Sequence, residues 1–320
     1  MSRVRPTVPV PVPVPARPRA RLVRLFAVVT AAAVVAVATV TGTIAGPRAS
    51  GLAQDPIPTR IVSLVPAVTE MLFACGAGPA VVGVSSYDRY PAQAMDRPKV
   101  GALVDPDVEA IFRLKPDLVV VYATQSDLIA QLTRAGIPLF RYQHAGLSDI
   151  TETIRRLGRR IDHVPETVRL AMSIEKELDA VRASVAGTPR PRTLLLFGRE
   201  PGSLRGLYAS GGVGFLHDLL VVAGGDDVFA DVKQQSLQIS TETVLARAPE
   251  VILEVHPSDG WTPDRIERET AIWSALPSVP AVRHHRVRIL ADDLLSIPGP
   301  RVAIAARMLA EALHAPGSGF

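Results

Sequence analysis

The chain has 320 residues, 48% of them hydrophobic, which is enough for one large domain or two of ordinary size. Its formal charge of +4 suggests a nucleic-acid-binding protein, but the location of that charge argues against one. Residues 1–54 hold seven of the 35 Lys and Arg and no acid, so 28 basic residues remain against 31 acidic ones. The single cysteine, Cys75, excludes an intrachain disulfide.

The first 54 residues have the composition of a targeting or anchoring segment. A stretch rich in Val, Pro and Arg is followed by Leu25–Ile44, twenty residues without a charge, which is long enough to span a bilayer. The arginines before it favour the cytoplasmic side, so the rest of the chain is expected outside the cytoplasmic membrane. Two interpretations stay open: a signal peptide cleaved after a small residue such as Ala45 or Ala53, or a retained N-terminal membrane anchor.

From residue 57 onward, strand and helix patterns alternate, as in a parallel α/β sheet. Arg60–Val65 and Val81–Val84 are expected to be strands, and Ala67–Cys75 a buried helix that ends at Gly76. Asp107–Val121 predicts a short helix, a stop at Pro116 and a buried strand. A helix, a strand and a helix follow at Ser126–Ala135, Ile137–Tyr142 and Leu147–Arg160.

Val164–Val185 predicts one uninterrupted helix of about 33 Å. Its apolar face is expected to contain Val168, Ala171, Leu178, Val181 and Val185. The absence of Gly and of internal Pro after Pro165 indicates a stiff connection between the segments on either side.

The earlier pattern then starts again. Arg192–Phe197 corresponds to the first strand, Gly214–Ala223 to the first helix, and Val228–Val232 to the second strand. Ser240–Val255 repeats Asp107–Val121, since Glu242 lies seven residues before Pro249 as Glu109 does before Pro116. A last strand and a closing helix are expected at Val287–Leu290 and Arg301–His314.

This repetition predicts an α/β fold with two similar parallel-sheet lobes joined by one long rigid helix. The expected limits are 57–162 for the N-terminal lobe, 163–187 for the linking helix and 190–315 for the C-terminal lobe. A single doubly wound sheet is the alternative, but it leaves the long helix and the repetition unexplained.

The sequence contains no catalytic signature: no G-x-S-x-G, no phosphate loop, no H-E-x-x-H and no paired-cysteine metal site. The glycines of Gly211–Gly214 precede a helix and are explained by a tight turn as well as by an anion site. His144 and His256 each follow an expected strand, where a metal or catalytic site could form, although an exposed or core-edge histidine is the ordinary case.

Aromatic residues are the more informative set. Tyr87, Tyr122, Tyr142 and Phe197 each lie at or just beyond the carboxyl end of an expected strand. Packing of the strand–helix junction would explain any one of them, whereas four at equivalent places in both lobes favour a ligand cleft between the lobes.

Glu109 and Glu242 form a second matched set. A carboxylate in the first turn is stabilised by the helix dipole, which is a sufficient reason for either residue alone. The same residue at the same place in both lobes indicates in addition a surface that meets a two-fold symmetric basic partner.

Several segments together resemble a known family, the extracytoplasmic substrate-binding proteins of ABC importers for vitamin B12, haem and ferric siderophores. These segments are SLVPAVTEMLFACG, VVGVSSYDRYP, PDVEAIFRLKPDLVVV, the long helix and STETVLARAPEVILEV, within residues 58–314. GVSSYDRYP is most similar to the members that bind vitamin B12 (cobalamin).

The resemblance implies a role for each of the matched residues. Two lobes on a rigid helix would hold the ligand, and Glu109 and Glu242 would dock to arginines of a permease dimer that works with a cytoplasmic ATPase. The aromatics that stack on the ligand would be Tyr87, Tyr122 and Phe197, with an arginine contact near Arg301.

The chain also departs from the pattern of the cobalamin-binding members. Leu103 and a polar residue near Ser236 stand where those relatives have tryptophans in the cleft. Ser203–Gly214 looks like an addition whose Arg205 and Tyr208 would reach the ligand. The resemblance as a whole still implies that the transported ligand is a metal chelate, a corrinoid before haem or an iron–siderophore complex. It implies no resident cofactor and no protein-bound metal.

Three other functions remain as alternatives. One is an enzyme such as a metal chelatase, which would need a histidine and an acid converging in the cleft. The second is a free-metal-ion binding protein, with three or four converging ligands. The third is a membrane-tethered interaction domain.

Overall fold

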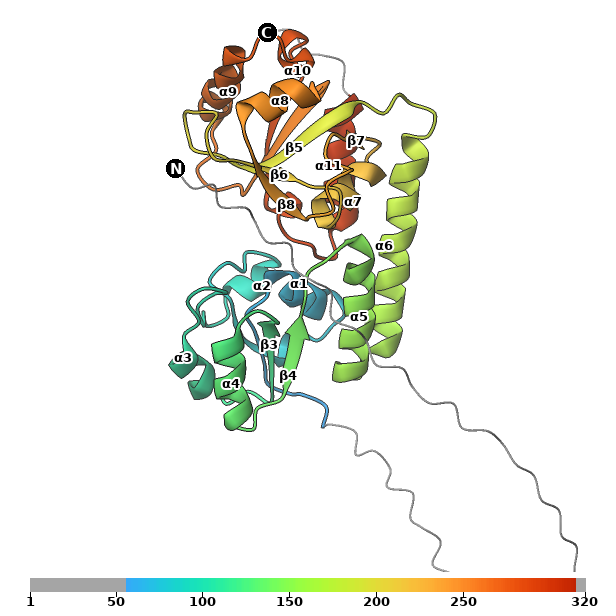
Figure 1. Cartoon of the computed structure of the whole chain (residues 1–320). Coiled ribbons are helices and arrows are strands. Elements are labelled where there is room, and N and C mark those ends of the chain that lie inside the picture. The colour runs from blue at the N-terminus through green and yellow to red at the C-terminus, as the bar shows by residue number, and fades with distance from the viewer. Residues whose placement is uncertain (1–55, 315–320) are drawn as a thin grey trace, which may run out of the picture. The chain divides into compact units, whose positions relative to one another are not determined.

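The computed structural model describes residues 56–314, which contain two separate sheets (Figure 1). The N-terminal lobe comprises β1 (Ile61–Ser63), α1 (Pro66–Ala74), β2 (Val81–Val84), α2 (Ala92–Met95), α3 (Val108–Arg113), β3 (Leu118–Tyr122), α4 (Ser126–Arg134), β4 (Leu139–Tyr142) and α5 (Leu147–Ile161). The long helix α6 (Val164–Ser184) follows. The C-terminal lobe comprises β5 (Arg192–Gly198), β6 (Leu207–Ser210), α7 (Phe215–Val222), β7 (Asp226–Asp227), β8 (Ser236–Ile239), α8 (Thr241–Arg247), β9 (Val251–His256), α9 (Pro263–Ala271), α10 (Pro280–Arg283), β10 (Val287–Ala291) and α11 (Val302–His314).

The first sheet is wholly parallel, with the strand order β2-β1-β3-β4. Leu118–Val121 is buried throughout, as expected for a central strand with both faces covered. Gly76 ends α1 with a φ of 89°, in the left-handed conformation that its type favours. The predicted fold class, two parallel-sheet lobes joined by a long helix, is confirmed, and the single doubly wound sheet is excluded.

The second sheet has the order β10-β9-β5-β6-β8, and β7 pairs with β5 off this path. β10, β9 and β5 are parallel, whereas β6 and β8 are antiparallel additions at one edge. β6 falls inside the segment Ser203–Gly214, which the sequence marked as an addition without assigning it a strand. The two lobes are therefore similar in their parallel strands and differ at this edge.

The prediction of a strand at Val228–Val232 is wrong. Only Asp226 and Asp227 pair with β5, and the chain then turns, because the backbone N–H groups of Ala230 and Val232 donate to the carbonyls of Asp227 and Phe229. Val228 and Phe229 are buried under the second sheet. The apolar run that suggested a strand is explained by the burial of a turn.

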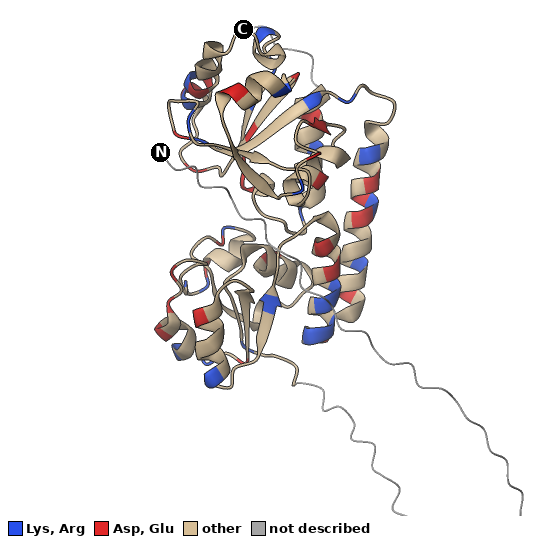
Figure 2. Cartoon of the chain, viewed as in Figure 1, with Lys and Arg blue, Asp and Glu red and all other residues tan. Residues whose placement is uncertain are grey.

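α6 matches its prediction to within one residue, and three of the five residues expected on its apolar face, Ala171, Leu178 and Val181, are buried. Thr167, Ala171, Ile174, Leu178 and Val181 are buried, whereas Val168 is exposed. Thr167 faces α5 at close approach, since a Cβ on Gly158 would lie 1.9 Å from the Thr167 hydroxyl oxygen. Acidic and basic residues are mixed along the helix, as Figure 2 shows.

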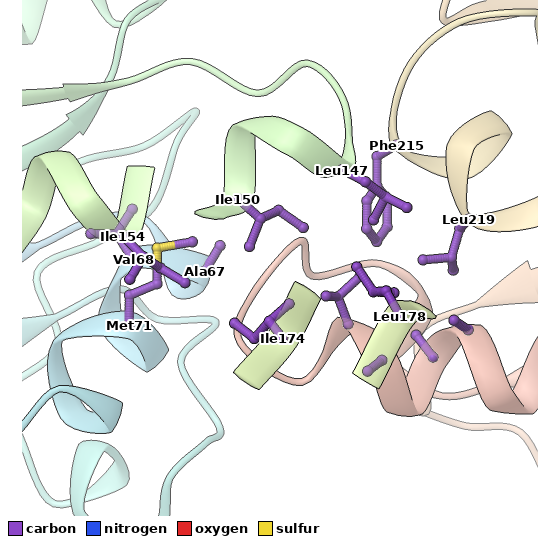
Figure 3. Packing of buried hydrophobic residues seen from close by; sticks show 14 of the residues in the cluster. Ala67, Val68, Met71, Leu147, Ile150, Ile154, Ile174, Leu178, Phe215 and Leu219 are labelled. Carbon is purple, nitrogen blue, oxygen red and sulfur yellow. The ribbon is translucent and has the colours of Figure 1, made fainter. Parts of the chain in front are cut away.

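One apolar cluster runs through both lobes and the long helix (Figure 3). It joins Met71 of α1, Ile154 of α5, Leu178 of α6 and Leu219 of α7, and it continues to Leu309 of α11. The described residues accordingly belong to one compact unit, and the expected limits of the separate lobes stay a prediction.

No helix among residues 56–314 combines the length and apolar character that a membrane crossing requires. The segment 25–44 lies outside the described residues.

Asp88, in the loop between β2 and α2, is a buried acid without a pairing partner. It is 3% exposed, and neither of its carboxylate oxygens has a hydrogen-bond partner. Burial raises the pKa of Asp88 to about 7, although the nearby Thr69 hydroxyl, the Ser85 backbone and the charge of Lys99 each act to lower it. Because the folded protein then holds this proton to higher pH than the unfolded chain does, its stability falls as the pH rises from about 4 to about 7.

We therefore predict that Asp88→Asn removes this pH dependence. The variant should exceed the parent in free energy of unfolding at pH 8 by up to about 4 kcal/mol and match it near pH 4, as measured by urea denaturation. Asp96→Asn changes an exposed acid and serves as the control that keeps the parent's pH profile. A D88N variant less stable than the parent at pH 8 would contradict the prediction.

Candidate functional site

A pocket of about 770 Å³ is lined by loops from both lobes. The N-terminal lobe contributes the predicted residues Tyr87, Leu103, Tyr122 and Tyr142, together with His144. The C-terminal lobe contributes Asp259, Trp261 and the segment around Ser296. The structure thus brings together four of the nine predicted ligand-binding residues.

Two tyrosines form the aromatic part of the N-terminal wall. Tyr122 and Tyr142 end neighbouring parallel strands in register, and their ring centroids are 5.9 Å apart in an edge-to-face arrangement. Burial raises the pKa of Tyr122 to about 12 and raises that of Tyr142 still further, so both stay neutral phenols. Neutral rings of this kind offer flat contact area with a polar tip.

His144 continues this wall. The Tyr142 hydroxyl lies 3.3 Å from His144 Nδ1, and the imidazole packs edge-on against Phe215 with 5.5 Å between centroids. Burial lowers the pKa of His144, which favours the neutral imidazole. A neutral imidazole beside a pocket can act as an axial ligand to a metal held in a chelate.

The loop of residues 101–107 forms part of the pocket lining through Ala102, Leu103 and Val104. Gly101 has a φ of 82°, and a Cβ there would lie 2.2 Å from the Asp105 carbonyl oxygen, so only glycine fits. The amide of Gln125 donates to the Leu103 carbonyl at 3.0 Å and fixes the tip. Val104 at that tip is 93% exposed, an arrangement suited to an apolar ligand edge or a partner.

Trp261 dominates the opposite wall, and the sequence reasoning missed it. Its ring lies over His256, with 4.3 Å between centroids, and the Arg265 guanidinium lies 4.2 Å from its centroid. Trp261 follows β9 by five residues, so the rule that selected the other aromatics, proximity to the carboxyl end of a strand, would also have found it.

A buried network of charged residues holds His256, the residue on which Trp261 packs. Glu254 of β9 accepts hydrogen bonds from Arg199 at 3.0 Å, from the Trp273 indole at 2.5 Å and from His256 at 3.2 Å. Arg199 also bonds Glu269 at 2.7 Å, so the guanidinium is paired on two sides. A network satisfied in this way fixes His256, and through it the plane of Trp261.

Two ion pairs join the lobes beside the pocket. Arg89 and Asp259, both pocket residues, form a bidentate pair across it. Glu70 of α1 is buried and accepts two hydrogen bonds from Arg301, the one through Nε at 2.9 Å. The Arg301 guanidinium lies 3.8 Å from the centroid of Tyr90. Arg301, predicted to contact ligand, therefore also ties the lobes together.

The remaining predicted ligand-binding residues lie outside the lining of this pocket. Arg301 borders a separate pocket of about 580 Å³. Phe197 and Tyr208 pair on β5 and β6 with 6.3 Å between centroids, and Arg205 forms an exposed ion pair with Glu200 at 3.0 Å. Ser236 starts β8 and is exposed. Their contact with ligand stays a prediction.

The two docking candidates occupy equivalent places. Glu109 is in the first turn of α3, and Glu242 is in the first turn of α8. Both are exposed, and both follow an N-cap side chain, Asp107 or Ser240, that accepts a backbone hydrogen bond from the third helical residue.

The two histidines weighed for metal or catalytic chemistry differ in position. His144 lines the pocket, and His256 lies behind Trp261. Among residues 56–314, no three side chains of His, Cys, Asp or Glu converge in the way a metal-ion site requires.

Comparison with known proteins extends over most of the chain. Residues 61–294 match the model of the periplasmic binding protein family. The vitamin B12-binding protein of Salmonella typhimurium is 32% identical over 256 residues, 79% of this chain and 90% of that protein.

Two solved structures are also similar, each with a TM-score of 0.67 over 80% of this chain and 97% of the other. They are the periplasmic vitamin B12-binding protein of Vibrio cholerae, 26% identical, and the periplasmic haem-binding protein of Roseiflexus sp. RS-1, 28% identical. With the two-lobed fold and the pocket between the sheets, these matches show that the chain belongs to the periplasmic binding protein family.

Proposed function

We propose that the chain is the substrate-binding protein of an ABC importer and that its pocket takes a bulky metal chelate, a corrinoid first. The observation that carries the proposal is the pocket itself, whose facing walls come from different lobes and hold Tyr87, Tyr122 and Trp261. Flat aromatic walls suit a macrocycle, and the relatives named for vitamin B12 support the corrinoid.

The relatives are binding proteins rather than enzymes. We infer that this chain likewise makes and breaks no bond: it captures the ligand outside the cytoplasmic membrane and hands it to a permease dimer served by a cytoplasmic ATPase. Export through the leader, either cleaved or retained as an anchor at 25–44, belongs to the same proposal.

Haem is the second candidate, and one observation favours it. His144 is a neutral imidazole beside the pocket, and the haem-binding relative has the same fold. An iron macrocycle would gain an axial ligand there, whereas a corrinoid that carries its own lower ligand has less need of one.

A binding panel tests the ligand. Calorimetry with cyanocobalamin, cobinamide, haemin and a ferric siderophore should give one-to-one binding at micromolar or lower Kd for a corrinoid. Trp261→Ala should weaken this binding about tenfold, or ~1.4 kcal/mol, because it removes one stacking wall. Met172→Ala changes an exposed residue of α6 and should leave the Kd unchanged. No binding to any of the four compounds would refute the ligand proposal.

His144 separates the two candidates. If haem is the ligand, His144→Ala should shift the Soret band of the haemin complex and weaken haemin binding while cobalamin binding stays the same. An unchanged haemin spectrum in the variant would remove the one argument for haem. His314→Ala, at the end of α11, is the matched control.

The docking role predicts a separation of binding from transport. Reversing both carboxylates, with Glu109→Arg and Glu242→Arg, should abolish uptake and stimulation of the ATPase by the protein and leave ligand Kd within about twofold. Glu311→Arg, an exposed acid of α11, should retain uptake. Loss of ligand affinity in the double variant would show that the pair belongs to the ligand site.

A further inference from the structure

The helices α3 and α8 have corresponding backbones, but only some of their side chains match. Ile111 and Val244 occupy equivalent positions and are both buried. Lys115 and Ala248, just beyond the helix ends, both have a left-handed φ of 45°. Arg113, by contrast, corresponds to Ala246, so equivalent positions need not carry similar residues.

Two exposed positions nevertheless carry similar residues in both helices, a large apolar side chain in each case. Phe112 lies three residues after Glu109 and is 40% exposed, and Leu245 lies three residues after Glu242 and is 42% exposed. Residues three apart on a helix are neighbours on one face. Each lobe therefore presents a carboxylate and a large apolar side chain side by side.

The two helices are held firmly enough to act as fixed contacts. Arg60 donates to the Leu114 carbonyl at 2.6 Å, at the end of α3, and Arg192 donates to the Arg247 carbonyl at 2.7 Å, at the end of α8. An acid that follows the proline after each helix adds to this support. Asp117 accepts a hydrogen bond from the Arg60 amide, and Glu250 accepts one from the Arg192 amide. Contacts on rigid supports lose little freedom on binding.

We propose that Phe112 and Leu245 are apolar anchors of the permease-docking surface, which rests on the proposed function. Each would enter one of two equivalent apolar recesses in the permease dimer, beside the basic group that meets Glu109 or Glu242. Interfaces combine an apolar centre with a charged rim, and a two-fold partner requires the same combination twice.

Charge favours this occupant over a lipid surface. Anionic membranes attract basic segments, whereas the acids Glu109 and Glu242 stand next to these apolar side chains. A protein surface with a basic group beside an apolar recess would complement both the carboxylate and the apolar side chain of each contact.

Docking of the ligand-loaded protein to its own importer in nanodiscs tests the proposal. Phe112→Ala and Leu245→Ala should each weaken docking about fivefold, and the double variant more than tenfold, without changing the ligand Kd. Ile304→Ala is the matched control, because Ile304 is 40% exposed on α11. Equal affinity of the double variant and the parent would overturn the proposal.

The charge-reversed variant makes the two failures distinguishable. If Glu109→Arg with Glu242→Arg abolishes docking while the alanine variants do not affect it, the anchor proposal fails and the docking function stands. If neither set changes docking, both fail. A photoreactive benzoylphenylalanine at 112 or 245 should crosslink to the permease subunit and at 304 should not; crosslinks to lipid alone would overturn the proposal.

Discussion

The continuous apolar core is the feature on which the rest of the structure depends. A cluster that passes from Met71 through Ile154 and Leu178 to Leu219 cannot be divided between the lobes without exposing buried surface. The close contact of Gly158 with Thr167 locks α5 onto α6 within it. Large separation of the lobes would therefore cost apolar burial, and the pocket is essentially formed before a ligand arrives.

The two ion pairs between the lobes also oppose their separation, but they contribute to different extents. Glu70 is buried, so opening its pair with Arg301 would leave a carboxylate with unmet hydrogen bonds. The pair of Arg89 and Asp259 is exposed and contributes little to stability, since water replaces it readily. Small movements that break only the pair of Arg89 and Asp259 therefore require the least free energy. Both of these residues line the pocket.

Much of the fold was predictable because it depends on local patterns. The helix–proline–strand step, the left-handed end at Gly76 and the length of α6 are each encoded within one segment, and Tyr122 and Tyr142 follow from strand ends alone. The errors arise where a local pattern fits more than one structure or where contacts with a distant segment decide the outcome. The turn at Val228 has the apolar run of a strand, Thr167 of α6 faces Gly158 in another helix, and the partner of Arg301 is 231 residues away.

In the N-terminal lobe, ligand and permease contacts would be made by one continuous segment. Leu103 and Asp105 line the pocket, and Asp107, two residues on, caps α3 by accepting the Ala110 amide at 2.8 Å. Gly101 and Gln125 restrict this segment at its start and its tip. Under the proposed function, a ligand that presses on Leu103 would act on the same short loop that sets the start of the helix carrying Glu109, and this shared loop would connect occupancy of the pocket with the geometry of docking.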